Sequence, residues 1–86
     1  MVITEREFFL LAERYGLSPR QRELVRHLLS GRLEDRQLAA LMGVARSTIQ
    51  EQFNRIFKKM HARSRTEVMH KFVSEAQLIN SDPNNA

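Results

Sequence analysis

The stretch that decides the fold is Gln37-Leu38-Ala39-Ala40-Leu41-Met42-Gly43-Val44-Ala45-Arg46-Ser47-Thr48-Ile49. A short segment with helical periodicity ends at Gly43, a turn of about three residues follows, and a longer periodic segment begins near Arg46. Gly43 supplies the left-handed backbone conformation that a tight turn after a helix requires. Ala39 is small where two helices would cross closely, and Ile49 can fill the angle between them. The stretch therefore predicts a helix-turn-helix motif.

The remainder of the chain is also predicted to be helical. Start and stop signals mark helices at Thr4 to Tyr15, Ser18 to about Gly31, Asp35–Met42, Arg46–Met60 and Ser64 to about Ile79. Three of these helices open with Ser or Thr followed three residues later by Glu or Gln, which is the pattern of a capping box. No segment alternates as a strand does. We expect an all-α fold, although a helical hairpin in any bundle shares some features of the central motif.

The domain organisation follows from these elements. We expect residues 1–16 to form an extra N-terminal helix, residues 17–79 the helix-turn-helix domain and residues 80–86 a polar tail. The run Phe8-Phe9-Leu10-Leu11 in the first helix is interpreted as additional core, with a partner-docking surface as the alternative.

Composition excludes several classes of protein. The 86 residues suffice for one domain, and 42% hydrophobic with 28% charged residues is a globular composition. No cysteine is present, which excludes disulfides and thiolate zinc sites, and the three histidines lack metal-ligand spacing. No apolar run is long enough for a membrane span, and no catalytic arrangement is recognisable. We therefore expect a cytoplasmic protein that is not an enzyme and needs no cofactor, metal or membrane.

The positive charge is concentrated in one part of the chain. The net charge is +4, but residues 46–71 contain seven basic residues and only two acidic ones, which gives that segment a net charge of +5. Such asymmetry indicates a polyanionic partner. A solvated surface rich in lysine and arginine is the alternative interpretation.

The helix Arg46–Met60 separates into two faces. Ile49, Phe53, Ile56 and Phe57 fall on one side by helical spacing. The other side carries the polar residues Arg46, Gln50, Glu51, Asn54, Arg55 and Lys58. Amides can pair with adenine, guanidinium groups with guanine or phosphate, and a carboxylate can accept from cytosine. The polar side therefore predicts a DNA-reading surface, whereas a purely solubilising surface would more often pair Glu with Lys.

A family resemblance supports this interpretation. The segments Leu17-Ser18-Pro19-Arg20-Gln21-Arg22-Glu23, Gly31, Gln37 to Gly43 and Arg63-Ser64-Arg65-Thr66-Glu67 resemble the LuxR-type (GerE-type) DNA-binding domain of bacterial transcriptional regulators, over about Leu17 to Phe72. The resemblance implies a four-helix domain whose third helix, here Arg46–Met60, reads DNA and whose fourth helix often supports dimerisation.

The resemblance also implies site residues. Matching positions are Gln50, Glu51 and Asn54 for contacts to bases, and Ser47, Thr48, Lys58 and Lys59 for contacts to the DNA backbone. We add Arg46 and Arg55 as backbone contacts, because both lie on the polar side of the helix and carry positive charge.

Four departures from the family pattern concern the reading helix and its approach. The loop Arg32-Leu33-Glu34-Asp35 is one residue longer than is usual, Ala45 stands where a serine cap is common, Ser47 where a lysine is common, and Gln52 where a histidine is frequent. Ser47 with Gln50 offers an alternative cap one turn later. Glu51 brings a negative charge to the reading surface, where it can select against wrong sites.

The last helix carries apolar residues on more than one side. We predict that Val68, Phe72, Val73 and Ala76 form a homodimer interface, which would place two reading helices on a palindromic DNA site. The alternative is that the first helix packs there and buries these residues.

Together these features predict a DNA-binding transcriptional regulator, or its isolated DNA-binding domain, acting on double-stranded DNA. Residues 1–16 leave no room for a sensing domain, so we expect either a fragment or a regulator controlled by its expression or by a partner. Two alternatives remain: a protein–protein module that acts on RNA polymerase or another regulator, and a sigma-factor-like promoter reader.

Overall fold

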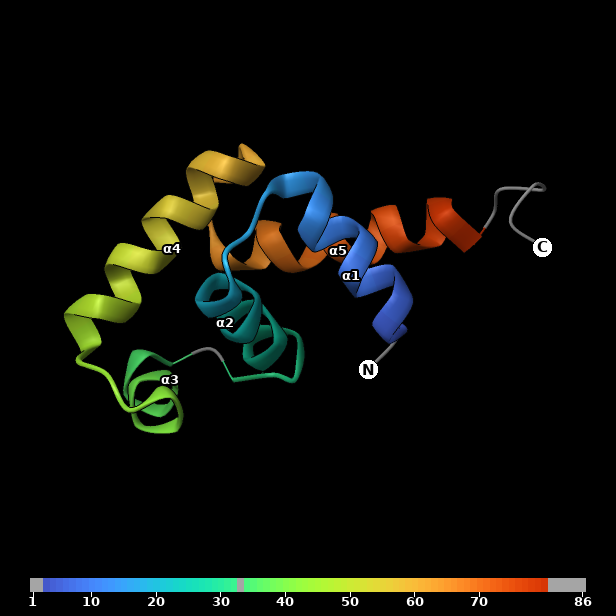
Figure 1. The fold of residues 1–86 in the computed structure, drawn as a ribbon. Helices are drawn as coiled ribbons and strands as arrows, with labels where there is room; N and C mark the ends of the chain where they lie inside the picture. Colours follow the sequence, from blue (N-terminus) through green and yellow to red (C-terminus); the bar gives the residue numbers. More distant parts are fainter. Residues whose placement is uncertain (1–2, 33, 81–86) are drawn as a thin grey trace.

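A bundle of helices makes up the described part of the chain, which is residues 3–32 and 34–80 of the computed structural model (Figure 1). These helices are α1 (Glu5–Tyr15), α2 (Pro19–Leu29), α3 (Asp35–Met42), α4 (Arg46–Met60) and α5 (Arg65–Asn80). No strand occurs within these residues. The predicted all-α helix-turn-helix fold with an additional N-terminal helix is confirmed. Leu33 of the predicted longer loop and residues 81–86 of the predicted tail lie outside the described residues.

The first two helices begin at the capping boxes that the sequence predicts. The Glu7 backbone N–H donates to Thr4 Oγ1 at 3.1 Å, and the Thr4 N–H donates to Glu7 Oε1 at 2.8 Å. Ser18 and Gln21 make the same pair of hydrogen bonds at 3.2 and 2.9 Å, with Pro19 at the first helical position. Each box satisfies backbone donors that the helix itself leaves open, which explains why both start points could be read from the sequence.

The start of α5 differs from this pattern. The Glu67 N–H donates to Ser64 Oγ at 3.1 Å, as predicted, but the Glu67 carboxylate accepts a hydrogen bond from the Arg63 N–H at 3.0 Å. The Glu67 carboxylate therefore also fixes the backbone of Arg63, the residue before the capping Ser64. This contact secures the connection from α4 to α5.

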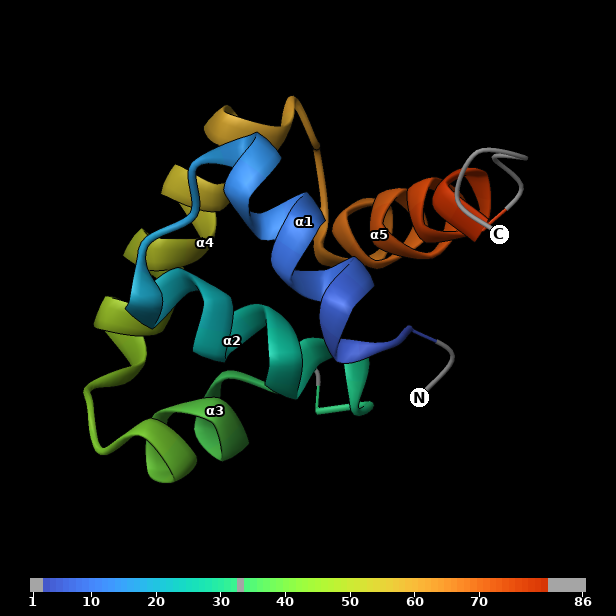
Figure 2. The ribbon, with the colours of Figure 1, turned by 45° about the vertical axis from the view of Figure 1, so that its right-hand side comes forward.

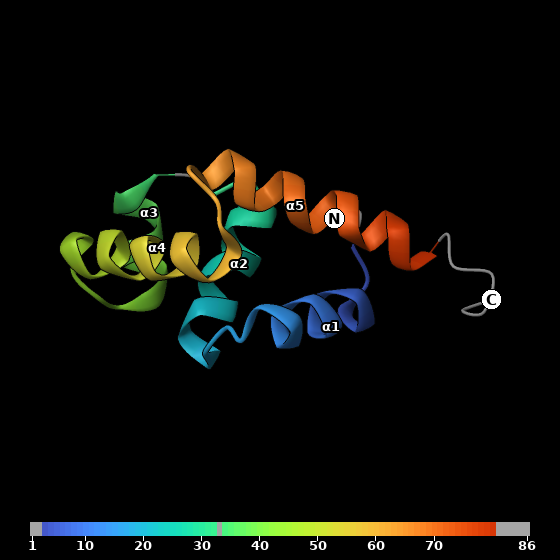
Figure 3. The ribbon, with the colours of Figure 1, turned by 90° about the horizontal axis from the view of Figure 1, so that it is seen from above.

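The helices are arranged with α2 in the middle. Figures 1 and 2 show α3 and α4 at one end of the molecule and α1 against α5 at the other, and the view from above in Figure 3 separates the same two pairs. All five helices contribute to one hydrophobic core. Its largest fully buried side chains are Phe8, Phe53, Phe72, Leu11, Leu24, Leu28, Leu38, Ile49, Ile56, Met60, Val25 and Val68.

The contact between α1 and α5 is both apolar and polar. The Phe8 ring stacks on Phe72 with centroids 5.4 Å apart, and the Tyr15 ring lies 6.2 Å from Phe72. The Tyr15 hydroxyl donates to Glu75, which also pairs with Arg14 at 3.4 Å. Burial and this acidic partner raise the pKa of Tyr15 to about 12. Helix α1 is therefore integrated into the fold.

This packing corrects the predicted dimer interface. Val68, Phe72 and Ala76 are at most 2% exposed and belong to the core of the single chain, so the prediction that they form a surface between two copies is wrong. The physical reason is that helices of the same chain cover α5: α1, α2 and α4 all pack against it, and Phe8 of α1 stacks on Phe72. Val73 alone of the four is partly exposed.

The apolar run of α1 divides between core and surface. Phe8 and Leu11 are buried, as the core interpretation requires, whereas Phe9 is 54% and Leu10 39% exposed. Arg22 covers part of the Phe9 ring, with its guanidinium carbon 5.8 Å from the centroid. None of the helices in the described part is long and apolar enough to cross a membrane.

The link between Tyr15 and Glu75 can be tested by titration, because Tyr15 is the only tyrosine in the chain. We expect the phenol to ionise with a pKa near 12 in the folded protein, and Glu75→Gln to bring it closer to the ordinary value of 10. Since the folded state holds the proton more tightly, this contribution to stability is complete below pH 10 and is lost as the pH rises toward 12. Absorbance of the tyrosinate against pH measures both variants. An ordinary tyrosine pKa in the native chain would contradict the contact.

Candidate nucleic-acid interface

The turn between α3 and α4 has the geometry that the sequence predicts. Gly43 adopts the left-handed conformation (φ 65°, ψ 36°). The Val44 N–H then donates back to the Ala39 carbonyl at 3.0 Å, which closes the end of α3. From α2, Arg20 Nη1 donates to the Met42 carbonyl at 3.4 Å. The turn thus fixes the angle at which α4 leaves α3.

Packing divides α4 into a buried and an exposed side. Ile49, Phe53, Ile56 and Met60 are at most 1% exposed, and Phe57 is half-buried with its ring stacked 5.9 Å from that of Phe53. The opposite side lies along the outer edge of the molecule (Figure 1). It presents five exposed polar side chains, namely Gln50, Glu51, Asn54, Arg55 and Lys58. We call these five residues the reading face.

Three of these side chains were predicted to contact bases, and their surroundings differ. Gln50 Nε2 donates to Asp35 Oδ2 at 3.0 Å. Glu51 pairs with Arg55 one turn later at 2.7 Å, and both side chains are more than half exposed. Asn54 is exposed and makes no side-chain hydrogen bond to the described residues. The structure therefore brings the three predicted base contacts onto one surface.

The N-terminus of α4 is open. Ala45 occupies the cap position with extended backbone (φ −74°, ψ 156°) and offers no side-chain hydrogen bond. Arg46 and Ser47 are exposed, and Thr48 is half-buried. The alternative cap one turn later is wrong, because the helix already begins at Arg46 and Gln50 donates to Asp35 instead. Open N–H groups and the helix dipole favour an anion at this end.

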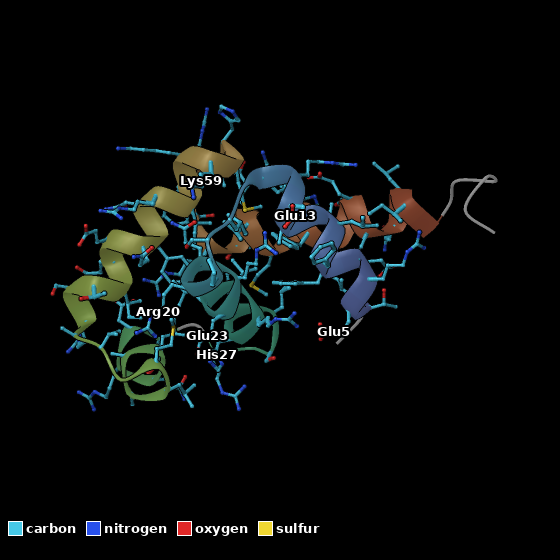
Figure 4. All side chains as sticks on the ribbon, viewed as in Figure 1. Glu5, Glu13, Arg20, Glu23, His27 and Lys59 are labelled. Carbon is cyan, nitrogen blue, oxygen red and sulfur yellow. The ribbon has the colours of Figure 1, made fainter. Side chains whose placement is uncertain are left out.

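The predicted phosphate contacts do not all have the same role. Arg46, Arg55 and Lys58 extend from the exposed side of α4. Lys59 instead donates from Nζ to the Gly16 carbonyl at 2.9 Å and to Gln21 Oε1 at 2.7 Å. Figure 4 shows Lys59 on α4, close to the connection between α1 and α2. Lys59 therefore also holds α4 against the rest of the fold.

A cluster around Asp35 was missed by the sequence analysis. Arg65, at the start of α5, forms an ion pair with Asp35, and its guanidinium carbon lies 4.0 Å from the centroid of the Phe53 ring. The two residues are 30 positions apart, so spacing gave no indication that they meet. The only available signal was the place of Arg65 within the segment Arg63 to Glu67.

Asp35 is ionised through this cluster. Burial alone would raise the pKa of Asp35, but hydrogen bonds from Gln50 and Arg65 and the charges of Arg65 and Arg46 outweigh burial and lower that pKa. An open hollow lies beside it, lined by Glu34, Asp35, Arg36, Arg46 and Arg65. Two carboxylates and three guanidinium groups thus come together where α3, α4 and α5 begin.

These features define a class of protein. A helix-turn-helix whose second helix is held by its apolar side and presents amide and cationic groups outward is typical of DNA-binding regulators. The family model described as "Bacterial regulatory proteins, luxR family" matches residues 15–72, which is more than half of the chain. The chain therefore belongs to the LuxR family, and its helix-turn-helix is the DNA-binding domain of a transcription regulator.

The family match leaves out parts of the first and last helices. It begins at Tyr15 and ends at Phe72, so most of α1 and the second half of α5 lie outside it. Comparisons with curated proteins and with solved structures gave no match. The description of the contact between α1 and α5 therefore rests on the structure of this chain and not on a relative.

The open cap of α4 leads to a stability prediction. Ala45→Ser should raise the free energy of unfolding by about 1 kcal/mol, because a serine Oγ at this extended position can accept from the first-turn N–H groups. Denaturant unfolding measures the change. Ala40→Ser, at an exposed position inside α3, is the matched control and should slightly lower stability. Equal effects of the two substitutions would contradict the capping argument.

Neighbouring lysines offer a second test of the geometry. Lys59→Ala removes two hydrogen bonds to the α1–α2 connection and should lower the free energy of unfolding by about 1 kcal/mol. Lys58→Ala, on the exposed side, should leave stability within about 0.5 kcal/mol of the native chain. Urea unfolding of both variants makes the comparison. Indistinguishable midpoints would show that Lys59 does not hold the fold together.

Proposed function

We propose that this chain is a sequence-specific transcription regulator, or the DNA-binding domain of one, that places α4 in the major groove of double-stranded DNA. The observation that carries the proposal is the exposure of Gln50, Glu51 and Asn54 on one side of a helix whose other side is buried. An α-helix fits the major groove, where each base pair presents a distinct pattern of donors and acceptors.

Groups at the two ends of the exposed side of α4 suit contacts to the DNA backbone. Arg46 and Ser47 lie at the open N-terminus of α4, and Lys58 lies about three turns further along the same helix. Cationic groups at both ends of a groove-bound helix can meet phosphates on either side of the groove. This distribution supports positioning by phosphates and specification by the central polar side chains.

The proposal includes a homodimer on a palindromic site, with a smaller interface than predicted. Within α5, Met69 and Val73 are apolar, partly exposed and one turn apart. This surface, rather than the buried Val68, Phe72 and Ala76, is where a second copy would contact α5. A two-fold arrangement would space the two copies of α4 by about one turn of DNA.

Binding to duplex DNA at increasing salt concentration tests the function. We expect a steep loss of affinity with salt, and selection from a random duplex pool should return a palindromic sequence. Lys58→Ala should weaken binding to all duplexes alike and reduce the salt slope by about one. Asn54→Ala should reduce discrimination at one base pair by about tenfold.

Arg14→Ala removes a positive charge that lies on α1, outside α4, and is already paired with Glu75, so it should leave binding unchanged. No binding at low salt would contradict the proposed function and favour a protein–protein module. Binding only in the presence of RNA polymerase would favour a sigma-like promoter reader. A selected sequence without two-fold symmetry would contradict the dimer.

A further inference from the structure

The amide of Gln50, on the reading face, is held by a carboxylate from α3. Gln50 Nε2 donates to Asp35 Oδ2 at 3.0 Å. Asp35 is the first residue of α3, and its side chain is only 17% exposed. The contact therefore joins an exposed side chain of α4 to a partly buried group on the preceding helix of the motif.

Asp35 itself has a fixed position and a fixed charge. Its other oxygen pairs with Arg65, whose guanidinium lies over the buried Phe53 ring. The lowered pKa keeps the carboxyl ionised at neutral pH. An ionised carboxylate can only accept hydrogen bonds. The side of the Gln50 amide that faces Asp35 must therefore be the nitrogen.

This geometry determines what Gln50 offers to DNA. With its NH₂ group against Asp35, the carbonyl oxygen of Gln50 is directed away from Asp35. Rotating the amide by half a turn would bring that oxygen against the carboxylate and lose a hydrogen bond to a charged group. The free amide could present either edge to a base, but the bound amide offers its carbonyl.

We propose that Asp35 is a positioning residue that makes Gln50 an acceptor and thereby sets base specificity, an inference that rests on the proposed function. Gln50 then selects a base with an exocyclic amine in the major groove, adenine N6 or cytosine N4, over one with a keto oxygen, guanine O6 or thymine O4. Adenine fits best, because the second N–H of the amide can donate to its N7.

Charge complementarity explains why Asp35 is tolerated close to DNA. The negative charge of Asp35 is offset by Arg65 in direct contact and by Arg46 nearby. Glu34, the preceding residue, is exposed and makes no side-chain cap hydrogen bond. Glu34 therefore carries the same charge in nearly the same place without the contact to Gln50, which makes it the matched control.

The experiment compares base preferences of the native chain, Asp35→Ala and Glu34→Ala in selection from a random duplex pool. Gln50→Ala identifies the base pair that Gln50 reads. At the base of that pair that Gln50 contacts, we expect the native chain and Glu34→Ala to prefer adenine or cytosine over guanine or thymine by about tenfold. In Asp35→Ala this preference should fall to within about twofold. Adding Asp35→Ala to Gln50→Ala should change nothing further.

Two outcomes would overturn the inference. One is an unchanged preference at that pair in Asp35→Ala; the other is an equal loss at every base pair, which would indicate a merely structural role. If Asp35→Ala fails to fold, Asp35→Asn keeps the size of the side chain. Because the asparagine amide can also donate to the Gln50 carbonyl, it permits both orientations, and the preference should fall as well.

A measurement without DNA separates this inference from the proposed function. We expect the side-chain amide resonances of Gln50 to shift as Asp35 is protonated, below the usual pH range of an aspartate, and this shift should vanish in Asp35→Ala. If the native chain showed the shift but bound no duplex, the proposed function would fail while the contact stood. Gln50 amide resonances that do not shift as Asp35 is protonated would overturn the contact itself.

Discussion

Burial of Phe53 is the constraint on which the interface depends. Its ring is 1% exposed, stacks on Phe57 and lies beneath the Arg65 guanidinium. Successive residues of a helix are about 100° apart, so inserting Phe53 with Ile49 and Ile56 into the core forces the intervening polar side chains outward. The exposed arrangement of the reading face is thus a consequence of core packing, and rotation of α4 would require the whole apolar stripe to leave the core.

Sequence reasoning succeeded where the determinants are local. The limits of α4 and the turn at Gly43 follow from helical periodicity and a left-handed glycine, both of which act within a few residues. It failed where the partner is distant along the chain. Neither the Asp35–Arg65 pair nor the role of Lys59 against Gly16 has a periodic signature, because 30 and 43 residues separate these partners.

The error about the dimer interface has the same origin. Helix α5 has apolar residues around more than half of its circumference, and the pattern alone cannot say whether α1 or a second copy covers them. A segment of the same chain reaches this surface at a high effective concentration, whereas a second copy loses translational and rotational freedom on binding. Phe8 stacks on Phe72 and Tyr15 hydrogen-bonds to Glu75, so the cover that is observed comes from α1 of the same chain.

Two ion pairs, one within the reading face and one beside it, differ in how readily their members can exchange partners. Glu51 and Arg55 are 61% and 58% exposed and one helical turn apart, so their pairing contributes only a few tenths of a kcal/mol. In the complex with DNA that we propose, Arg55 can therefore exchange Glu51 for a phosphate at little cost, which would free the Glu51 carboxylate to accept from a cytosine amine. Asp35 and Arg65 are 17% and 25% exposed, and Arg65 also covers Phe53. Breaking that pair would leave a partly buried charge unsatisfied, so in the proposed complex the Asp35–Arg65 pair remains intact.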